Sequence, residues 1–488
     1  MSPAAIAEAH REDAYIANTK AMSNGSSSYM NGGAVQLCMK RTTFLFDRHL
    51  HKEFPVIVRG SGSNLYTKDG RVIFDATSGA AVSCLGHGNK RVINAVFQQM
   101  ASGIPYLASG FFGHETVDDL CEELINGTGR KMARVYLTGS GSEAMEATCK
   151  LARQYFYEKD KSTPRVNFIA REGSYHGNTL GALGMSGHKA RRAPYAPFLM
   201  PNVHHVSSCN PYRQRLPNES DASFVSRKAA ELEAKFQELG PETVIGFCAE
   251  PIVGAALGCV AALPGYLKAM RDVCHRHGAL FILDEVMCGM GRTGTLHAWQ
   301  SENVVPDLQT IGKGLGGGYQ PVAGVLISQK VVNVLYNGTG QFIHGQTYQG
   351  MPVQAAAALE VQRIIRQHDV LDNVRTQGAY LGKLLKQHLS DHPNVGDIRG
   401  KGLFWGIEFV KDKKSKVAFE PKLSIAQKIH DLAISHPYNM TVYPGTGTVD
   451  GMCGDHIMLS PNYLVTKEDI EYIVRVTVDV IETVFENL

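Results

Sequence analysis

The stretch Leu280-Phe281-Ile282-Leu283-Asp284-Glu285-Val286 places four apolar residues directly before two carboxylates. An apolar run this short is typical of a strand buried on both faces, as in a parallel sheet covered by helices. Ligands of open α/β sheets bind at the carboxyl ends of the strands. Residues 280–286 therefore predict a fold class and also the edge of the sheet where a site is expected.

Further short β-rich runs surround this strand and alternate with segments of helical pattern. They lie at residues 135–137, 166–169, 244–247 and 324–327. Such alternation predicts an α/β fold with a mostly parallel sheet and helices on both faces.

The two ends of the chain differ from this middle part. Residues 1–40 are rich in Ala, Ser, Asn and Gly, which is typical of flexible or loosely docked chain. Lys68-Asp69-Gly70 is a turn signal between two short β-rich runs, so we expect a hairpin at residues 64–75.

After a long Ala-rich helix at about 352–367, the pattern predicts a smaller C-terminal α/β domain. Its expected elements are strands near 395–399 and 403–410, a helix near 424–435, another strand and a final helix. We expect an N-terminal extension at 1–58, a hairpin segment joining the small domain at 59–90, a large domain at 91–350 and the small domain at 351–488.

Composition excludes several function classes. The net charge of +3 comes from 49 basic and 46 acidic residues without a dense basic stripe, so nucleic acid is not the expected partner. The ten cysteines show no zinc or redox spacing, and neither a membrane span nor a signal peptide is evident. We expect a cytoplasmic protein that binds small molecules and no metal.

The segment Thr138-Gly139-Ser140-Gly141-Ser142-Glu143-Ala144 follows a predicted strand and opens a predicted helix. Small residues at a helix N-terminus let backbone N–H groups bind a phosphate. The same residues also fit a dinucleotide-binding turn, or an ordinary turn that leads into a helix. The dinucleotide alternative expects an acidic residue at the end of the next strand, where this chain has Arg171 before Glu172.

Two charged residues stand out beside this turn. Asp284 ends an apolar strand, where a buried carboxylate needs a cationic partner such as a protonated pyridine nitrogen. The alternative is an ordinary strand-terminal Asp that caps a loop or pairs with an Arg. Lys313 lies between an apolar strand and the glycine-rich run Gly314-Leu315-Gly316-Gly317-Gly318. Partial desolvation lowers the pKa of such an amine and suits it to form an imine.

Together these segments resemble the class III, or ω-type, aminotransferases of fold type I. The resemblance spans about residues 59–480 and is carried by Gly139-Ser140-Gly141-Ser142-Glu143-Ala144, Ser174-Tyr175-His176-Gly177, Glu250-Pro251, Asp284-Glu285-Val286, Lys313 and His344-Gly345-Gln346-Thr347. It implies a pyridoxal-phosphate enzyme that works by a ping-pong exchange of an amino group.

The resemblance also implies residue roles. Lys313 would bind the cofactor covalently and shuttle a proton, and Asp284 would keep the pyridine nitrogen protonated. The ring would lie between Val286 and Tyr175, and Glu250 would lie beside Asp284. The other implied cofactor contacts are Ser140, Gly141, Ser142 and His176, with Thr347 reaching in from the partner subunit of a homodimer.

Substrate selection is expected in front of the ring. The resemblance assigns this pocket to Ala81, Val82, Phe111, Phe112 and Ala255. Arg399 is a candidate clamp for a substrate carboxylate, or else a member of a structural ion pair. Several relatives carry an arginine near the position of Cys453. If that arginine binds a carboxylate in them, this protein is expected to prefer an amine without a carboxylate, or an acid that is placed differently.

Three functions remain open at this point. The first is transamination between an amine or amino acid and a keto acid or aldehyde. The second is racemisation or decarboxylation by the same machinery, and the third is an NAD-dependent oxidoreductase, in which Lys313 would have no role.

Overall fold

The computed structural model describes residues 44–367 and 369–488, and one compact unit runs from Pro55 to Leu488. Residues 44–54 belong to a separate N-terminal unit and contain no helix or strand. The segment 1–40, predicted to be flexible, lies outside the described residues. No helix in the described part of the chain is long and apolar enough to cross a membrane.

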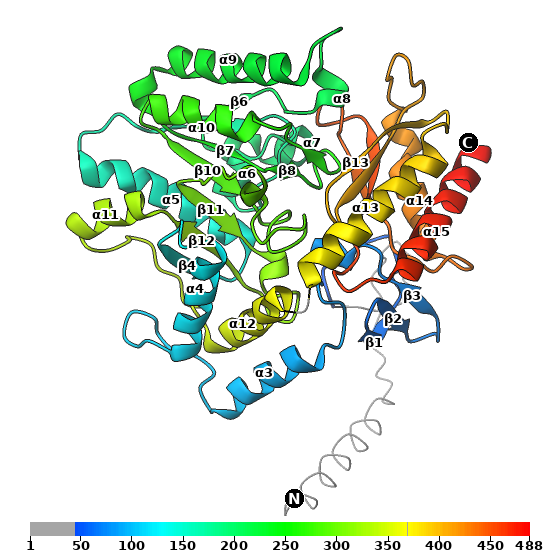
Figure 1. Cartoon of the computed structure of the whole chain (residues 1–488), viewed down its shortest axis with the longest axis horizontal. Coiled ribbons are helices and arrows are strands. Elements are labelled where there is room, and N and C mark those ends of the chain that lie inside the picture. The colour runs from blue at the N-terminus through cyan, green and yellow to red at the C-terminus, as the bar shows by residue number, and fades with distance from the viewer. Residues whose placement is uncertain (1–43, 368) are drawn as a thin grey trace, which may run out of the picture. The chain divides into compact units, whose positions relative to one another are not determined.

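The largest sheet of the compact unit has seven strands in the order β4-β12-β11-β10-β7-β5-β6 (Figure 1). They are β4 (Arg134–Thr138), β5 (Asn167–Arg171), β6 (Val203–Val206), β7 (Val244–Ala249), β10 (Leu280–Asp284), β11 (Leu308–Ile311) and β12 (Ala323–Ile327). Strand β12 is antiparallel to both neighbours, and the other pairs are parallel. The predicted α/β fold with a mostly parallel sheet is confirmed.

Alternating side chains of β10 bury opposite faces of this sheet. Leu280 and Ile282 belong to the same apolar cluster as the inner face of α5 (Gly141–Lys159). Phe281 and Leu283 belong to the cluster that includes α9 (Asp221–Leu239) and α10 (Tyr266–Arg276). Since both faces are covered, the strand is apolar throughout, as its sequence predicted.

A three-stranded antiparallel sheet lies near the start of the compact unit. It consists of β1 (Ile57–Ser61), β2 (Asn64–Thr67) and β3 (Val72–Phe74), so the predicted hairpin is confirmed and gains a further strand. The backbone of Phe74 donates to Asn439 O at 2.8 Å and accepts from Thr441 N at 2.9 Å. These bonds join the hairpin to the C-terminal part of the chain.

The C-terminal part contains a four-stranded antiparallel sheet in the order β13-β14-β16-β15. Its strands are β13 (Val395–Gly400), β14 (Trp405–Phe409), β15 (Tyr443–Thr446) and β16 (Asp455–Leu459), one more than predicted. The helices around it are α12 (Pro352–Arg366), α13 (Val370–Leu389), α14 (Ile425–Ile434) and α15 (Lys467–Glu486). The expected division into two domains near residue 350 stays a prediction.

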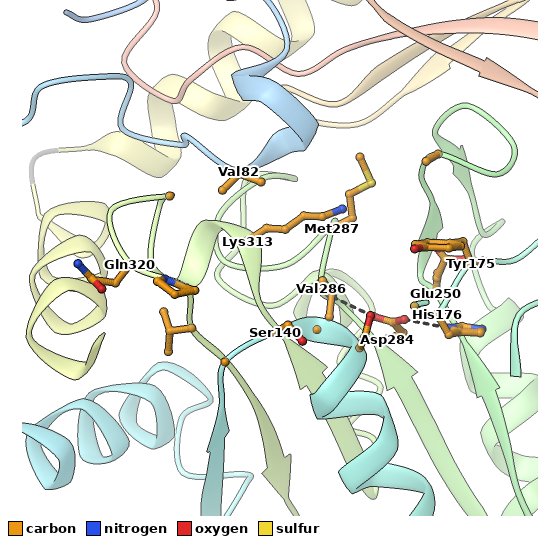
Figure 2. Close-up of a pocket in the computed structure, with 18 residues that line it drawn as sticks. Val82, Ser140, Tyr175, His176, Glu250, Asp284, Val286, Met287, Lys313 and Gln320 are labelled. Atoms are coloured by element: carbon orange, nitrogen blue, oxygen red, sulfur yellow. Dashed lines mark hydrogen bonds and ion pairs between the residues drawn. The ribbon is translucent and has the colours of Figure 1, made fainter. Parts of the chain in front are cut away.

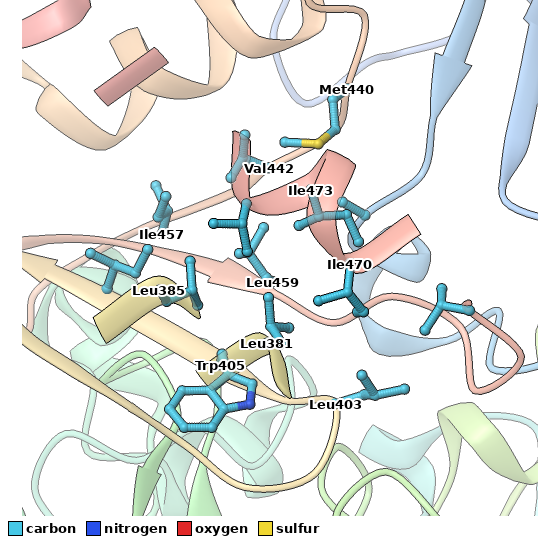
Figure 3. Close-up of a cluster of buried hydrophobic side chains, with 14 of the residues drawn as sticks. Leu381, Leu385, Leu403, Trp405, Met440, Val442, Ile457, Leu459, Ile470 and Ile473 are labelled. Atoms are coloured by element: carbon cyan, nitrogen blue, oxygen red, sulfur yellow. The ribbon is translucent and has the colours of Figure 1, made fainter. Parts of the chain in front are cut away.

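Helices α13 and α15 pack on this sheet through a common apolar core (Figure 3). Leu381 and Leu385 of α13 meet Ile457 and Leu459 of β16, and Ile473 of α15 closes the layer. All five side chains are buried. Truncation of such a leucine to alanine typically lowers the free energy of unfolding by about 2–5 kcal/mol. This core therefore stabilises the packing of the helices on the C-terminal sheet.

The remaining helices and strands complete the unit. They are α2 (Ser78–Ala81), α3 (Lys90–Ala101), α4 (Glu115–Gly127), α6 (Leu180–Met185), α7 (Lys189–Arg192), α8 (Pro211–Gln214), β8 (Ile252–Val253), β9 (Val260–Ala261) and α11 (Gln329–Asn337). A 3-10 turn at Lys313–Leu315 comes directly after β11.

Candidate active site

A cavity of about 490 Å³ lies at the carboxyl ends of strands of the large sheet (Figure 2). Eleven residues predicted for the site line it: Val82, Ser140, Gly141, Ser142, Tyr175, His176, Glu250, Ala255, Asp284, Val286 and Lys313. The volume is within the usual range for a cofactor or substrate site. Residues distant in sequence therefore converge where the strand pattern predicted a ligand.

Asp284 lies at the buried floor of this cavity. Its Oδ1 accepts hydrogen bonds from Val286 N and from Thr310 Oγ1, both at 3.0 Å. Its Oδ2 is 2.8 Å from His176 Nδ1. Among residues 44–367 and 369–488, no Lys or Arg forms an ion pair with Asp284. The carboxylate is held in place and still lacks a strong cationic partner.

Glu250 and His176 form the wall next to Asp284 (Figure 2). Glu250 accepts from the backbone N–H of Tyr175 at 3.0 Å and of Gly254 at 3.3 Å. Burial raises the pKa of Glu250, and the nearby His176 opposes this shift. The Nε2 atom of His176 is buried and has no partner in the described part of the chain.

Arg171 supports this wall from beneath and was missed as a site residue from sequence. It is fully buried, and its Nη2 donates to Glu250 O at 2.5 Å while Nη1 donates to Cys209 Sγ at 3.0 Å. A charged residue at the end of an apolar strand was the available signal. Sequence reasoning used it only as evidence against a dinucleotide site.

Lys313 enters the cavity from the turn that follows β11, and Figure 2 shows it extending past Val286. Its φ of 45° is uncommon for a residue with a side chain, at a typical cost of about 1–3 kcal/mol. Gln362 Nε2 holds the turn by donating to the carbonyls of Gly314 at 3.1 Å and Leu315 at 2.9 Å.

Withdrawal from water lowers the pKa of the Lys313 amine from its ordinary value of 10.5 to about 8. The negative charges of Asp284 and Glu250 oppose this shift but do not cancel it. No described residue forms an ion pair with Lys313. At pH 7 a pKa of about 8 leaves roughly a tenth of the amine neutral and nucleophilic, whereas an ordinary lysine is almost fully protonated.

The turn into helix α5 forms the opposite side of the cavity. Ser140 caps the helix by accepting from Glu143 N at 3.2 Å, and Glu143 in turn accepts from Gly139 N at 2.8 Å. First-turn amides such as those of Gly141 and Ser142 have no acceptor within a helix and can bind an anion. A Cβ at Gly141 would lie 2.8 Å from Val286 Cγ1, so glycine lets the two segments meet.

Four predicted residues besides Arg399 do not line the cavity. Ala81 is buried behind it, whereas Thr347 is exposed and Phe111 and Phe112 are 82% and 64% exposed. The contribution of Thr347 to the cavity of a partner subunit stays a prediction. Residues lining the cavity that were not predicted include Met287, Gln320, Pro321 and Val322.

Arg399 lies in a saturated cluster outside the cavity. Its Nη1 pairs with Asp397 at 2.8 Å and Glu408 at 2.6 Å, and its Nε donates to Gly258 O at 2.8 Å. Its Nη2 donates to Leu257 O, and only 12% of the side chain is exposed. Of the two roles considered for Arg399, this geometry favours the structural ion pair.

A comparison with protein families gives a match over most of the chain. The model of the family "Aminotransferase class-III" matches residues 46–481. An aminotransferase of Gibberella zeae is 52% identical over 420 residues, which cover 86% of this chain and 82% of that protein. An uncharacterised aminotransferase of Schizosaccharomyces pombe is 43% identical over 436 residues, covering 89% of this chain and 94% of that one.

Solved structures give the same result. The ω-transaminase of Pseudomonas jessenii, in complex with PMP, superposes with a TM-score of 0.83 at 30% identity. The superposition covers 90% of this chain and 97% of that structure. These likenesses extend over both the large sheet and the C-terminal elements, and they do not support the dinucleotide alternative.

Proposed function

The chain belongs to the class III aminotransferases, and from that premise we propose that its cavity binds pyridoxal phosphate on Lys313 and uses it for transamination. The amino group would move between an amine or amino acid and a keto acid or aldehyde. The main support for this proposal is that Lys313 and Asp284 line the same cavity. They follow or end the adjacent strands β11 and β10.

The residues of the cavity fit such a cofactor. Asp284 offers a buried carboxylate without a Lys or Arg partner, which suits a protonated pyridine nitrogen. The first-turn amides of α5 suit the phosphate, and the amine of Lys313 suits the aldehyde. Val286 and Tyr175 line the space between these groups and supply apolar surface for the ring.

When bound, pyridoxal phosphate would supply an aldehyde that takes up the donor's amino group and later returns it, and a ring that accepts electrons from the substrate carbon. Asp284 would hold a proton on the ring nitrogen, which strengthens that acceptance. His176 and Thr310 fix the two oxygens of Asp284, so the carboxylate keeps one orientation. Glu250 holds the Tyr175 backbone and thereby the ring of Tyr175.

Lys313 would be the group that moves protons. With its pKa near 8, Nζ can accept a proton from the substrate carbon and then return it at a neighbouring atom. A normal, fully protonated lysine would be a poor base at neutral pH. The depressed pKa is thus the property that the reaction requires from this residue.

Amine exchange provides the direct test. The purified enzyme, supplied with pyridoxal phosphate, would be titrated with terminal amines and α-amino acids without any carbonyl acceptor, while its visible absorbance is recorded. We expect loss of the yellow band with some donors and its return on addition of a keto acid. The variant Lys313→Ala, as a matched control, should bind cofactor without amine exchange.

Consumption of a donor without lasting loss of the yellow band would contradict transamination and favour racemisation or decarboxylation, because these reactions return the cofactor to its aldehyde form without a keto acid. Turnover by Lys313→Ala equal to that of the native enzyme would contradict the role of Lys313. Far-ultraviolet circular dichroism of the variant would show that its fold is retained, so loss of activity is attributable to the amine.

We further propose a homodimer in which Thr347 of each subunit completes the phosphate site of the other. The support is the exposure of Thr347 together with large exposed apolar side chains at Phe111, Phe112 and Tyr348. Light scattering should give twice the monomer mass, and Phe111→Glu should shift it to monomer. Thr347→Val should raise the Kd for pyridoxal phosphate by about tenfold without changing the mass.

We also propose that the enzyme works in a reducing compartment, with the cytosol as the expected location. The support is that all nine cysteines in the described part of the chain are free. Subcellular fractionation with an antibody against the protein would test this location.

A further inference from the structure

Arg171 and Glu250 join the ends of two adjacent strands through reciprocal contacts. Arg171 is the last residue of β5, and Glu250 directly follows β7, the parallel neighbour of β5. The guanidinium Nη2 of Arg171 donates to the backbone O of Glu250 at 2.5 Å. The carboxylate of Glu250 in turn accepts from the backbone N of Tyr175 at 3.0 Å, in the segment that begins with Arg171. The two side chains thus close a loop that ends at the wall of the cavity.

Arg171 is a buried cation without a carboxylate that pairs with it. It is fully buried, and within residues 44–367 and 369–488 no Asp or Glu side chain forms an ion pair with it. Its guanidinium carbon lies 5.6 Å from the centroid of the Tyr266 ring. Burial acts against this charge, but Cys209, Tyr266 and Glu250 outweigh it and raise the pKa of the guanidinium. The group therefore stays charged over the physiological range of pH.

The charge of Glu250 depends on the groups around its carboxylate. Burial raises the pKa of Glu250, and the negative charge of Asp284 adds to this effect, whereas His176 and Arg171 oppose it. The charged or titratable groups around Glu250 in the described part of the chain are Arg171, His176, Cys248, Asp284, Cys288 and Lys313. His176 is bonded to Asp284, and the amine of Lys313 has a pKa of about 8. The guanidinium is therefore the permanent cation of this set.

Both carboxylate oxygens of Glu250 serve as acceptors. Oε1 accepts from Tyr175 N, and Oε2 accepts from Gly254 N at 3.3 Å. A protonated carboxyl group carries a hydrogen on one oxygen, so one of these two bonds would become a contact between two donors. An ionised Glu250 therefore holds Tyr175 and Gly254 together, whereas a neutral Glu250 would release one of them.

We propose that Arg171 is a positioning residue that keeps Glu250 ionised and fixed, and thereby holds Tyr175 against the proposed cofactor ring. Loss of the guanidinium would let Glu250 take up a proton and would loosen this wall of the cavity. The part that Arg171 plays in the reaction rests on the proposed transaminase function. Its control of Glu250 is a property of the cofactor-free protein and can be measured there.

The first measurement is an infrared titration of the cofactor-free protein, which follows the band of protonated carboxyl groups. Subtraction of the spectrum of Glu250→Gln isolates the contribution of Glu250. In the native protein we expect the midpoint of this titration to lie below pH 7. Arg171→Gln keeps an N–H donor for the backbone O of Glu250 but removes the charge, so it should raise the midpoint by about one to two pH units. Arg171→Lys should recover part of the shift.

Arg292→Gln is the matched control. It removes another fully buried guanidinium whose Nη1 donates to backbone carbonyls, those of Leu403 at 3.0 Å and of Pro461. Its loss should lower the free energy of unfolding, measured in denaturant, and leave the midpoint of Glu250 unchanged. An unmoved midpoint in Arg171→Gln, or an equal movement in Arg292→Gln, would overturn the proposal. A native midpoint above pH 7 would overturn it without any variant.

The second measurement follows amine exchange by the cofactor-loaded enzyme as a function of pH. The acid limb of the rate should move upward by about one pH unit in Arg171→Gln, and it should not move further when this change is added to Glu250→Gln. If no donor exchanges its amine, transamination fails, and the infrared titration still decides whether Arg171 controls Glu250. If exchange occurs and the acid limb does not move although the midpoint of Glu250 does, transamination stands and the positioning role is overturned.

Discussion

Two buried charged regions of this molecule have opposite properties. In the Asp284 centre, formed by Asp284, His176 and Thr310, the carboxylate has no Lys or Arg partner in the described part of the chain and faces a cavity. In the Arg399 cluster, formed by Arg399, Asp397, Glu408 and Arg213, each charge is paired. A buried charge indicates a binding site where its pairing is incomplete.

The lysine and the arginine of these regions illustrate the difference. Lys313 lies without an ion pair at the cavity, and desolvation lowers the pKa of its amine to about 8. Burial also acts against the charge of Arg399, but Glu408 and Asp397 outweigh it and raise the pKa of this guanidinium. Lys313 can therefore exchange a proton at physiological pH, whereas Arg399 stays charged and structural.

The largest effect that would sharpen this contrast is expected from Asp284→Asn. Loss of the charge that stabilises a protonated ring nitrogen should slow the half-reaction with an amine donor by about 10²–10³-fold. Single-turnover absorbance measurements would give the rate. Asp307→Asn is a matched control, because Asp307 is an equally buried aspartate that pairs with His275 and Lys330 away from the cavity. An unchanged rate for Asp284→Asn would contradict the conclusion that the incompletely paired carboxylate of Asp284 marks a binding site.

A smaller effect, on stability rather than rate, is expected from Arg399→Met. Removal of the cation leaves Glu408 buried with one partner fewer, and breaking such a pair typically costs about 3–5 kcal/mol. Denaturant unfolding at fixed protein concentration would measure the loss. The double variant Arg399→Met with Glu408→Met should recover part of it. Native stability together with a raised KM for carboxylate substrates would instead make Arg399 a substrate clamp.

The sequence predicted the Asp284 centre better than the substrate side. Asp284, Glu250 and the turn before α5 follow apolar strands, so strand periodicity alone brings them to one edge of a sheet. Thr310 could not be found this way, because its bond to Asp284 depends on the register between β10 and β11. Phe111 and Phe112, predicted for the substrate pocket, do not line the cavity, because the place of their segment is set by tertiary contacts that no local pattern encodes.

The smallest of the expected effects is a tenfold dependence on pH, and it tests Lys313 directly. Only the neutral amine attacks an aldehyde. A pKa of about 8 should therefore make the rate of covalent attachment of pyridoxal phosphate rise about tenfold between pH 7 and pH 9.

The same pKa shift predicts a trend in stability. Because the amine in the unfolded chain keeps its proton up to about pH 10.5, the free energy of unfolding of the cofactor-free protein should rise as pH increases from about 8 to 10.5. Stopped-flow absorbance and denaturant unfolding would measure the two trends, and Lys313→Ala should lack both. A rate that rises about a hundredfold between pH 7 and pH 9 and keeps rising above pH 9 would mean that the amine has an ordinary pKa. Its surroundings would then compensate its charge as those of Arg399 do.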